Sequence, residues 1–295
     1  MNSMMNLPLG IYEKALPYDL TWASRLEAAK RAQFDYVELS IDESDERLAR
    51  LDQANAERVD IRNASIVTGV PLKTMCLSAH RKYPFGSASV ETRQQALDIL
   101  DKAVDLACEL GIRVIQLAGY YVYYEDETEA SLGHYQDGLA KGLELAAKAG
   151  VMLAIENMDT VGVASLEEGM KLVSHFNSPW LQLYPDLGNL IEREKDILPE
   201  LERAKGHMVA LHVKDTRPGE PRRVPFGEGG VPFEAAFTKL YELGFNGPVM
   251  IEMWNDNAAD SLERVVKTRA WVVDKMLRSG LLKHHNMPIN SAKSV

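Results

Sequence analysis

Short apolar segments alternate along the chain with longer segments in which apolar residues recur at helical spacing. The short segments are rich in β-branched residues, which favour extended structure. They lie at residues 7–12, 35–41, 72–78, 112–118, 151–156, 181–186, 208–214 and 248–253. This alternation predicts eight strands, and no domain linker or low-complexity segment interrupts it.

Seven helices are predicted between and after these strands. One opens with Ser165 and has Glu168 three residues later, the two residues of a capping box. Another stops at Gly111, because glycine readily adopts the left-handed conformation that ends many helices. The predicted helices cover residues 21–32, 90–110, 134–149, 165–176, 195–205, 233–243 and 260–278.

Strands that alternate with helices predict a parallel sheet, because parallel neighbours need a crossover connection. Eight such units in 295 residues favour an α/β fold, a single (β/α)8 TIM barrel, over an open doubly wound sheet. The glycine-rich signatures GxGxxG and GxxxxGK[ST] of nucleotide-binding sheets do not follow the first strand. We therefore expect a barrel domain over residues 1–282 and a polar C-terminal tail over residues 283–295.

The composition excludes several classes of protein. With 33 Lys and Arg against 43 Asp and Glu, the net charge is −10, which argues against a protein that binds nucleic acid or an anionic membrane. A small anionic substrate held by local cations is still compatible with this charge. We see neither a signal peptide nor a transmembrane segment, and we expect a cytoplasmic protein. Cys76 and Cys108 lie far apart, so we expect two buried thiols and no disulfide.

Polar residues end four consecutive predicted strands, and in a barrel the strand ends carry the function. In three of these strands one parity is purely apolar, so the polar parity is expected to face the barrel axis. Carboxylates gathered there would repel one another without a neutralising cation or raised pKa values. Three oxygen donors and an imidazole suit one divalent ion, which could be Zn²⁺, Mn²⁺, Co²⁺ or Mg²⁺. The alternative to a metal site is that each acidic residue forms a separate structural ion pair with a Lys or Arg. The four residues are Glu156, Asp186, His212 and Glu252.

The chain resembles the xylose-isomerase-like superfamily of sugar epimerases and isomerases in the segments FDYVELS, CLSAHR, VIQLAGY, AIENMD, LYPDLGN, LHVKDTRPG, VPFGEG and MIEMW. The resemblance runs from about Leu7 to Gly280. The combination of GIYEKALP, CLSAHR and HVKDT…PFGEG is more closely similar to the L-ribulose-5-phosphate (L-xylulose-5-phosphate) 3-epimerases of L-ascorbate and pentose catabolism.

This resemblance implies a TIM barrel with one divalent metal ion held by Glu156, Asp186, His212 and Glu252. It also implies that Glu156 and Glu252 are the catalytic acid/base pair, which inverts carbon 3 of a pentulose 5-phosphate. Removing the proton next to the 2-carbonyl gives a planar cis-enediolate, and inversion returns a proton to its opposite face. The implied partners are a phosphorylated ketopentose as substrate and a second copy of the chain in a homodimer.

Several residues near the predicted strand ends are candidates for holding this substrate. After the seventh strand, the glycines of PFGEGG offer backbone N–H groups to an anion. Related epimerases of unphosphorylated sugars carry a histidine shortly after the sixth-strand aspartate, where Asn189 is the nearest candidate here. The expected substrate-binding residues are Lys14, Ser78, His80, Arg81, Asn189, Lys214 and Arg217.

Two questions of role stay open in the sequence. Glu38, at the end of the second strand, either orients a metal ligand or forms a structural pair. The tyrosines that follow the fourth strand either wall the pocket or build a subunit interface; they are Tyr120, Tyr121, Tyr123 and Tyr124.

Three other functions are also compatible with parts of the pattern. An aldose–ketose isomerase uses the same enediolate chemistry and the same ligand types. A metal-dependent repair endonuclease shares the fold but needs several more histidines at the strand ends. A non-catalytic sugar-phosphate binding protein would bind ligand without metal-dependent turnover.

Overall fold

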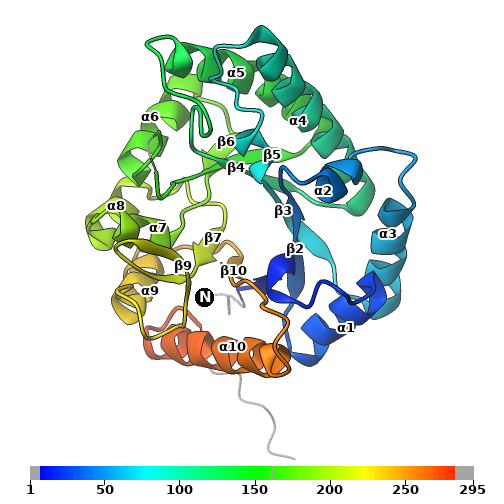
Figure 1. Ribbon diagram of the computed structural model, residues 1–295. Helices are drawn as coiled ribbons and strands as arrows, with labels where there is room; N and C mark the ends of the chain where they lie inside the picture. The colour runs from blue at the N-terminus through cyan, green and yellow to red at the C-terminus, as the bar shows by residue number, and fades with distance from the viewer. Residues whose placement is uncertain (1–6, 161, 283–295) are drawn as a thin grey trace, which may run out of the picture.

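The computed structural model describes residues 7–160 and 162–282. Eight parallel strands form a barrel surrounded by helices (Figure 1). The strands are β1 (Leu9–Tyr12), β2 (Tyr36–Ile41), β3 (Leu72–Leu77), β4 (Val114–Ala118), β5 (Met152–Glu156), β6 (Leu181–Leu183), β7 (Leu211–Val213) and β10 (Val249–Ile251). Their order is β6-β5-β4-β3-β2-β1-β10-β7, and the bridges Leu183–Met208 and Asp186–His212 join the two end strands. The predicted (β/α)8 barrel is confirmed; the predicted tail, 283–295, lies outside the described residues.

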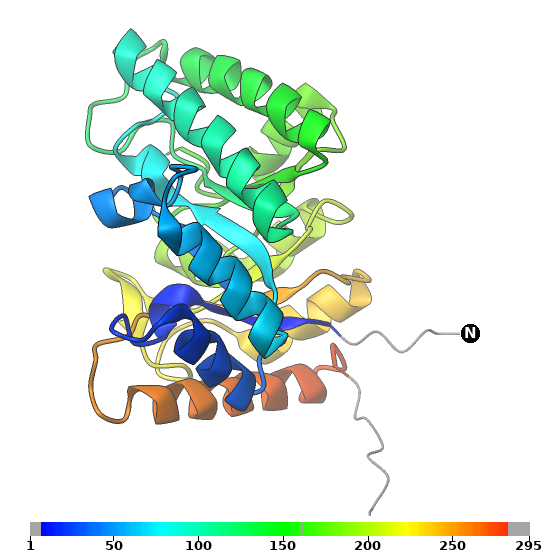
Figure 2. The same ribbon diagram turned by 90° about the vertical axis from the view of Figure 1, so that its right-hand side faces the viewer.

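The seven predicted helices are present, each within three residues of its predicted bounds, and the structure adds three more. The helices are α1 (Trp22–Arg31), α2 (Asp45–Ala49), α3 (Ala56–Thr68), α4 (Val90–Leu110), α5 (Ser131–Ala149), α6 (Leu166–Phe176), α7 (Leu187–Glu192), α8 (Ile197–Arg203), α9 (Phe233–Glu242) and α10 (Ser261–Arg278). The additional helices are α2, α3 and α7. Figure 2 shows α1, α3 and α4 side by side on the outside of the strands.

Local hydrogen bonds explain where these helices begin and end. Ser165 caps α6 by accepting a hydrogen bond from the Glu168 backbone N–H at 3.1 Å, and the Glu168 carboxylate accepts one from the Ala164 N–H at 2.7 Å. Gly111 ends α4 in the left-handed conformation, with φ of 75°. The predicted capping box and the glycine stop are therefore both confirmed.

Apolar side chains fill the layer between the strands and the helices. In β5, Leu153 and Ile155 belong to this main core, whereas Ala154 faces the barrel interior. Part of the interior is filled by Tyr36, whose ring lies so close to Gly10 that a Cβ there would come within 2.2 Å of it. Glycine is therefore required in β1 by the large ring on the neighbouring strand.

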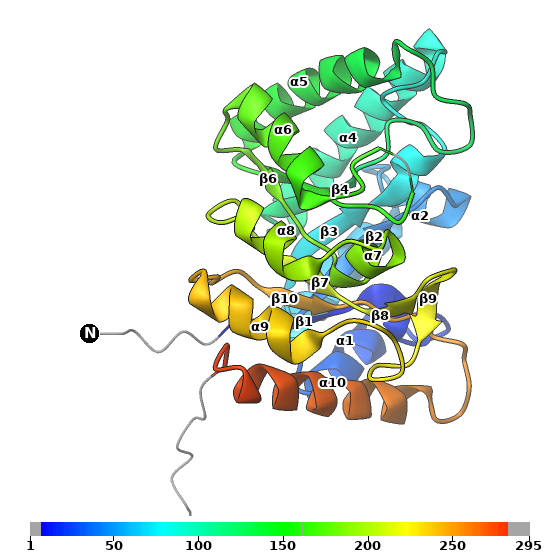
Figure 3. The same ribbon diagram turned by 90° about the vertical axis from the view of Figure 1, so that its left-hand side faces the viewer.

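A two-stranded antiparallel hairpin follows β7 and was not predicted from the sequence. It consists of β8 (Asp215–Arg217) and β9 (Glu220–Val224). Figure 3 shows it beside the loop that leads from β10 to α10, at the carboxyl end of the barrel strands. The hairpin therefore extends the wall of the barrel on the side where function is expected.

Two further expectations concern the cysteines and the membrane. Cys76 is buried as predicted, but Cys108 is exposed, which corrects the expectation of two buried thiols. The buried positions of α4 end at Ala107, and one more residue turns the side chain toward solvent. Of the helices that the structure describes, none is both long and apolar enough to span a membrane.

Candidate active site

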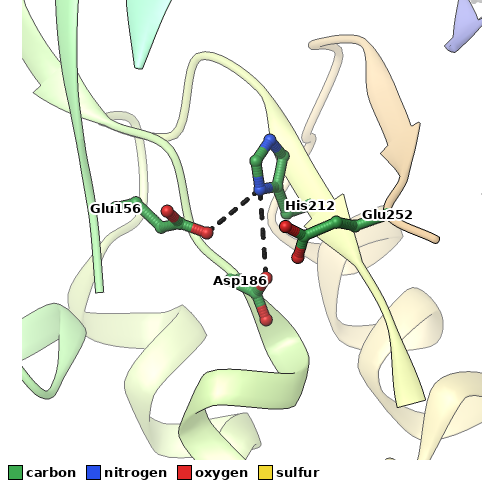
Figure 4. Close-up of side chains that lie close together, drawn as sticks. All are labelled: Glu156, Asp186, His212 and Glu252. Carbon is green, nitrogen blue, oxygen red and sulfur yellow. Dashed lines mark hydrogen bonds and ion pairs between the residues drawn. The ribbon is translucent and has the colours of Figure 1, made fainter. Parts of the chain in front are cut away.

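Four side chains from consecutive strand ends meet at the carboxyl end of the barrel. One ligand atom from each lies within 4.8 Å of those of the others, and all four residues are buried. Figure 4 shows two glutamates approaching from opposite sides, with an imidazole and an aspartate between them. The residues are Glu156, Asp186, His212 and Glu252. Three carboxylates and one imidazole, gathered from distant parts of the chain, could hold a metal ion.

Asp186 is held in place by the backbone that follows β6. It caps α7 by accepting a hydrogen bond from the Asn189 N–H at 2.8 Å through Oδ1. Asn157, directly after β5, binds the backbone of Asp186 in both directions, accepting at 2.8 Å and donating at 3.0 Å. These contacts lock the loops after β5 and β6 together and leave Asp186 Oδ2 to face the cluster.

Glu38 reaches across the barrel from β2 and contacts His212. Its Oε1 lies 2.9 Å from His212 Nε2, and its Oε2 accepts hydrogen bonds from Thr74 at 2.6 Å and Tyr184 at 2.8 Å. Because a carboxylate only accepts hydrogen bonds, Nε2 of His212 carries a hydrogen. His212 Nδ1 then points at the other three ligands, 3.0 Å from Glu156 Oε1. Glu38 therefore fixes the orientation of the imidazole of His212.

Lys214 is the buried cation closest to this cluster. Its Nζ lies 3.1 Å from Asp186 Oδ2 and 2.9 Å from Glu252 Oε2. Burial raises the pKa of Glu252, but the charges of Lys214 and His212, together with the hydrogen bond from Lys214, outweigh burial and lower the pKa of this carboxyl below its usual value. Burial also raises the pKa of Asp186, and the neighbouring carboxylates of Glu252 and Glu156 add to this rise. The single positive charge of Lys214 is thus too small to neutralise the carboxylates gathered here.

Two further observations indicate that the side-chain atoms of this cluster fit a divalent cation. Asp186 Oδ2 is buried and accepts no hydrogen bond from any described residue, although Lys214 forms an ion pair with it. Burial lowers the pKa of His212, but the carboxylates of Glu38 and Glu156 reverse the effect and raise it well above its ordinary value. A cation bound at Nδ1 would replace the proton there and neutralise the same carboxylates.

A cavity of about 80 Å³ opens from this cluster and brings together five of the seven expected substrate-binding residues. Those five are Lys14, Ser78, Arg81, Asn189 and Lys214. Asn189 lines the cavity while its amide nitrogen donates to the Asn157 carbonyl at 2.8 Å. Tyr120 also lines the cavity, whereas Tyr124 is 66 % exposed, so the tyrosine segment contributes to the pocket wall.

His80 and Arg217 lie outside this cavity, contrary to expectation. Ser78 and Arg81 are three residues apart in the 3₁₀ turn η2 (Ser78–Arg81) and share the face toward the cavity, so His80 points elsewhere. Its Nε2 lies 3.1 Å from the Ala96 carbonyl. Arg217 is half-exposed on the hairpin and donates to the Glu228 carbonyl at 2.8 Å.

The glycine-rich loop PFGEGG is likewise not open to an external anion. The carboxylate of Asp215 accepts hydrogen bonds from the N–H groups of Gly227 at 2.8 Å, Gly229 at 2.9 Å and Val231 at 3.2 Å. The anion in this cradle is therefore a side chain of the protein itself. The expectation that these glycines offer N–H groups to a substrate phosphate is corrected.

Several residues of the cavity wall were missed in the sequence, among them Asp159, Arg222 and Trp254. Arg222, on β9, forms an ion pair with Asp159 at 3.5 Å, and nothing in the sequence indicated that a hairpin would bring it back to the barrel mouth. Trp254 lines the cavity too, with Lys214 Nζ 5.8 Å from its ring centroid. Its position two residues after Glu252, and therefore on the same face of the segment, is a signal that could have revealed it.

Comparison with known proteins is consistent with this geometry. The family model described as a xylose isomerase-like TIM barrel matches residues 26–275. The chain is 48 % identical over 277 residues to the L-ribulose-5-phosphate 3-epimerase UlaE of Shigella boydii serotype 18, covering 94 % of this chain and 98 % of that protein. The enzyme of the same name from Escherichia coli O1:K1 is 47 % identical over the same shares.

Solved structures of sugar epimerases share the fold at much lower sequence identity. An L-ribulose 3-epimerase structure superposes with a TM-score of 0.79 at 17 % identity, covering 96 % of this chain and all of that one. The 3-keto-D-glucoside 4-epimerase YcjR of E. coli gives a TM-score of 0.76 at 17 % identity over 91 % of this chain and 100 % of that one. With its barrel, its strand-end cluster and its matched relatives, the chain belongs to the xylose isomerase-like TIM barrel family.

Proposed function

We propose that this chain is a metal-dependent epimerase that inverts carbon 3 of a pentulose 5-phosphate and interconverts L-xylulose 5-phosphate and L-ribulose 5-phosphate. The observation that carries the proposal is the meeting of two glutamates from well-separated strands at one buried cluster. The substrate name comes from the relatives at 47–48 % identity, which are L-ribulose-5-phosphate 3-epimerases. The same relatives favour a role in L-ascorbate or pentose catabolism.

Inversion at carbon 3 needs one group to remove a proton and another to return it. Glu156 extends from β5 and Glu252 follows β10, and their carboxylates approach one another from opposite sides (Figure 4). In the proposal, one carboxylate takes the proton next to the carbonyl and the other delivers a proton to the opposite face of the planar enediolate. Gln116 donates to Glu156 Oε2, and Lys214 donates to Glu252 Oε2 at 2.9 Å, so both carboxylates are held in fixed orientations.

The cluster of Glu156, Asp186, His212 and Glu252 would hold the divalent cation, which we propose to be Mn²⁺, Mg²⁺, Co²⁺ or Zn²⁺. When bound, such a cation supplies a Lewis acid that stabilises negative charge on the sugar oxygens beside the reacting carbon. Glu38 keeps the imidazole of His212 turned toward the cluster.

The cavity beside the two glutamates would hold the sugar phosphate. Lys14, Ser78, Arg81, Asn189 and Lys214 would contact the sugar phosphate, because they line the same cavity as the two glutamates. Asp159 and Arg222 line the same cavity and form an ion pair with each other. We also propose that the protein acts as a homodimer in the cytoplasm.

Turnover in D₂O tests the proposal directly. The purified protein, loaded with Mn²⁺ and given L-ribulose 5-phosphate, is expected to form L-xylulose 5-phosphate with deuterium at carbon 3. Formation of an aldose would instead identify an aldose–ketose isomerase, and binding without metal-dependent turnover would identify a non-catalytic protein. Retention of the original hydrogen at carbon 3 would overturn the two-base scheme.

Variants of the two glutamates test their roles separately. Glu156→Gln and Glu252→Gln are each expected to reduce inversion by at least about 10³-fold, because each removes one of the two proton-transferring groups. Glu144→Gln, which makes the same chemical change at an exposed position of α5, is the matched control and should retain inversion. An active Glu156→Gln or Glu252→Gln enzyme would refute the assignment of that residue.

A further inference from the structure

A second cavity, of about 340 Å³, lies next to the active-site cavity. It is bounded by β9 and the segment after it, by the loop between β10 and α10, and by the first half of α10 (Figure 3). Its volume is in the range of pockets that hold small organic molecules, about 300 to 1,000 Å³. Only three of its lining residues, Lys214, Glu252 and Trp254, also line the active-site cavity. The reaction proposed above therefore leaves most of this cavity without a function.

Aromatic side chains provide much of the apolar surface of this second cavity. Phe226, Trp254 and Trp271 all line it, and the rings of Phe226 and Trp271 meet edge to face, with centroids 6.0 Å apart and an angle of 66°. Each of the three side chains is only half-buried, so part of every ring is accessible to a ligand. Val265, on α10, adds aliphatic surface. Such a wall suits a planar ring, which stacks on aromatic side chains or meets their edges.

Arg223 is the cation of this cavity that an anionic ligand can reach without breaking an ion pair. The other three cations of the lining are each paired with a carboxylate: Lys214 with Glu252, Arg264 with Asp256 and Lys267 with Glu263. Asp215, which also lines the cavity, accepts hydrogen bonds from backbone N–H groups of the glycine-rich loop. No described residue forms an ion pair with Arg223, and a guanidinium binds a carboxylate or sulfonate through charge-assisted hydrogen bonds.

The backbone conformation of Arg223 is a further sign of a binding site. Arg222 lines the active-site cavity, whereas Arg223, the next residue of β9, lines the second cavity. Arg223 has φ of 68°, a left-handed conformation that costs free energy in any residue with a Cβ. Asn257, in the loop between β10 and α10, is also left-handed, with φ of 56°. Residues in such conformations are concentrated at ligand-binding sites, and here they occur in both loops that border the cavity.

We propose that this second cavity, the α10 pocket, binds a small organic monoanion that consists of a planar ring and one carboxylate or sulfonate group. The ring lies against Phe226, Trp254 and Trp271, and the anionic group pairs with Arg223. This ligand is distinct from the sugar substrate, because the α10 pocket is a separate cavity that only borders on the active site. Both ligands can therefore be bound at the same time. The inference does not depend on the proposed function.

Two probes that differ only in charge test the α10 pocket. The anion 2-naphthoate and the neutral 2-naphthalenemethanol share one planar ring system, and titration calorimetry measures the binding of each. The dissociation constant is expected to be about 1 mM or lower for 2-naphthoate and at least about fivefold higher for the alcohol. Arg223→Gln should weaken binding of 2-naphthoate by at least about fivefold and binding of the alcohol by less than about twofold. No saturable binding of 2-naphthoate up to about 5 mM would overturn the proposal.

A variant that fills the α10 pocket locates the binding. Thr268→Trp places a large ring in the pocket from α10 and should abolish binding of both probes. Ala270→Trp, on the opposite side of the same helix at an exposed position, is the matched control, and Arg31→Gln, on the outer surface, is the control for loss of charge. Wild-type affinity of Thr268→Trp for 2-naphthoate overturns the proposal. If Thr268→Trp does not fold, Arg223→Gln, at an exposed position, still decides, because an unchanged affinity for 2-naphthoate overturns the proposal too.

Competition with the sugar phosphate separates the α10 pocket from the active site. Saturating L-ribulose 5-phosphate is expected to raise the dissociation constant of 2-naphthoate by less than about tenfold, the limited effect of one bound anion on another nearby. A dissociation constant that rises in proportion to the sugar phosphate concentration would show that both ligands compete for one site, and it would overturn the proposal. A protein that does not bind L-ribulose 5-phosphate would refute the proposed function, whereas the measurements on Arg223→Gln and Thr268→Trp would still decide the α10 pocket.

Discussion

Glu38 illustrates how a residue outside a ligand set can decide the geometry of that set. It is fully buried, and its two oxygens accept hydrogen bonds from Thr74, Tyr184 and His212. These three contacts fix the carboxylate, and the carboxylate in turn fixes which nitrogen of His212 faces the acidic residues. A histidine ligand whose second nitrogen donates to a carboxylate is also a more basic ligand.

We expect Glu38→Gln to weaken divalent-ion affinity by about 10- to 100-fold, because the neutral amide polarises and orients the imidazole less well. Competition with a chromophoric chelator measures this affinity without any assay of turnover. Glu43→Gln is the matched control. It makes the same chemical change two residues after the end of β2, in a side chain that pairs with Arg81 and does not contact His212. An unchanged dissociation constant for Glu38→Gln would rule out the orienting role.

Among the elements, the β8–β9 hairpin and the glycine-rich loop after it depend on one carboxylate. Asp215 accepts hydrogen bonds from Gly227, Gly229, Val231 and the Thr216 N–H. This cluster anchors the base of the hairpin that brings Arg222 to the cavity. The glycine at 229 is needed for space: a Cβ there would come within 2.0 Å of Asp215 Oδ1 and 2.6 Å of the Thr216 carbonyl oxygen.

Gly229→Ala is therefore predicted to lower the free energy of unfolding by about 2 to 4 kcal/mol, since it displaces a buried carboxylate from its donors. Gly133→Ala serves as the control because no heavy atom lies within 4 Å of a Cβ at that position of α5. It should leave stability unchanged or raise it by up to about 1 kcal/mol. Urea unfolding followed by circular dichroism measures both, and equal stability of the two variants would contradict the steric argument.

For the whole molecule, His80 couples stability to pH. Its ring lies buried between η2 and α4, 4.4 Å from the Phe85 ring centroid and in contact with the Ala96 carbonyl. Burial lowers the pKa of His80 to about 4, and the contact with Ala96 only partly opposes this. Between this value and the ordinary value of about 6.5, the unfolded chain binds a proton that the folded chain does not.

The contribution of His80 to stability is thus complete above about pH 6.5 and is lost as the pH falls toward 4. At pH 4.5 the loss is about 2 to 3 kcal/mol relative to pH 7. His80→Gln keeps a donor for the Ala96 carbonyl but does not titrate, so its stability should fall less over the same interval. Urea unfolding at pH 7 and pH 4.5 compares the two proteins, and parallel losses would exclude His80 as the titrating group.

Local sequence signals were sufficient to predict most helices and strands, and there are physical reasons why the remaining elements were missed. Helix α3 carries a cap at each end, Asn55 and Gly69, but its buried apolar side chains are only Ile61 and Ala64. Its apolar stripe was therefore too narrow to stand out. The short helices α2 and α7 and the hairpin lack a repeating pattern of sufficient length for the same kind of inference.

The sequence by itself determined the alternation of strands and helices, and with it the barrel and the four polar strand ends, because each depends on the period of neighbouring residues. Only the tertiary structure decided which polar residues share one cavity. Arg222 rather than Arg217 lies there, Arg81 rather than His80, and Asp215 occupies the glycine-rich loop. These choices depend on how loops from different strands pack against one another, and such contacts between distant segments leave no periodic trace in the chain.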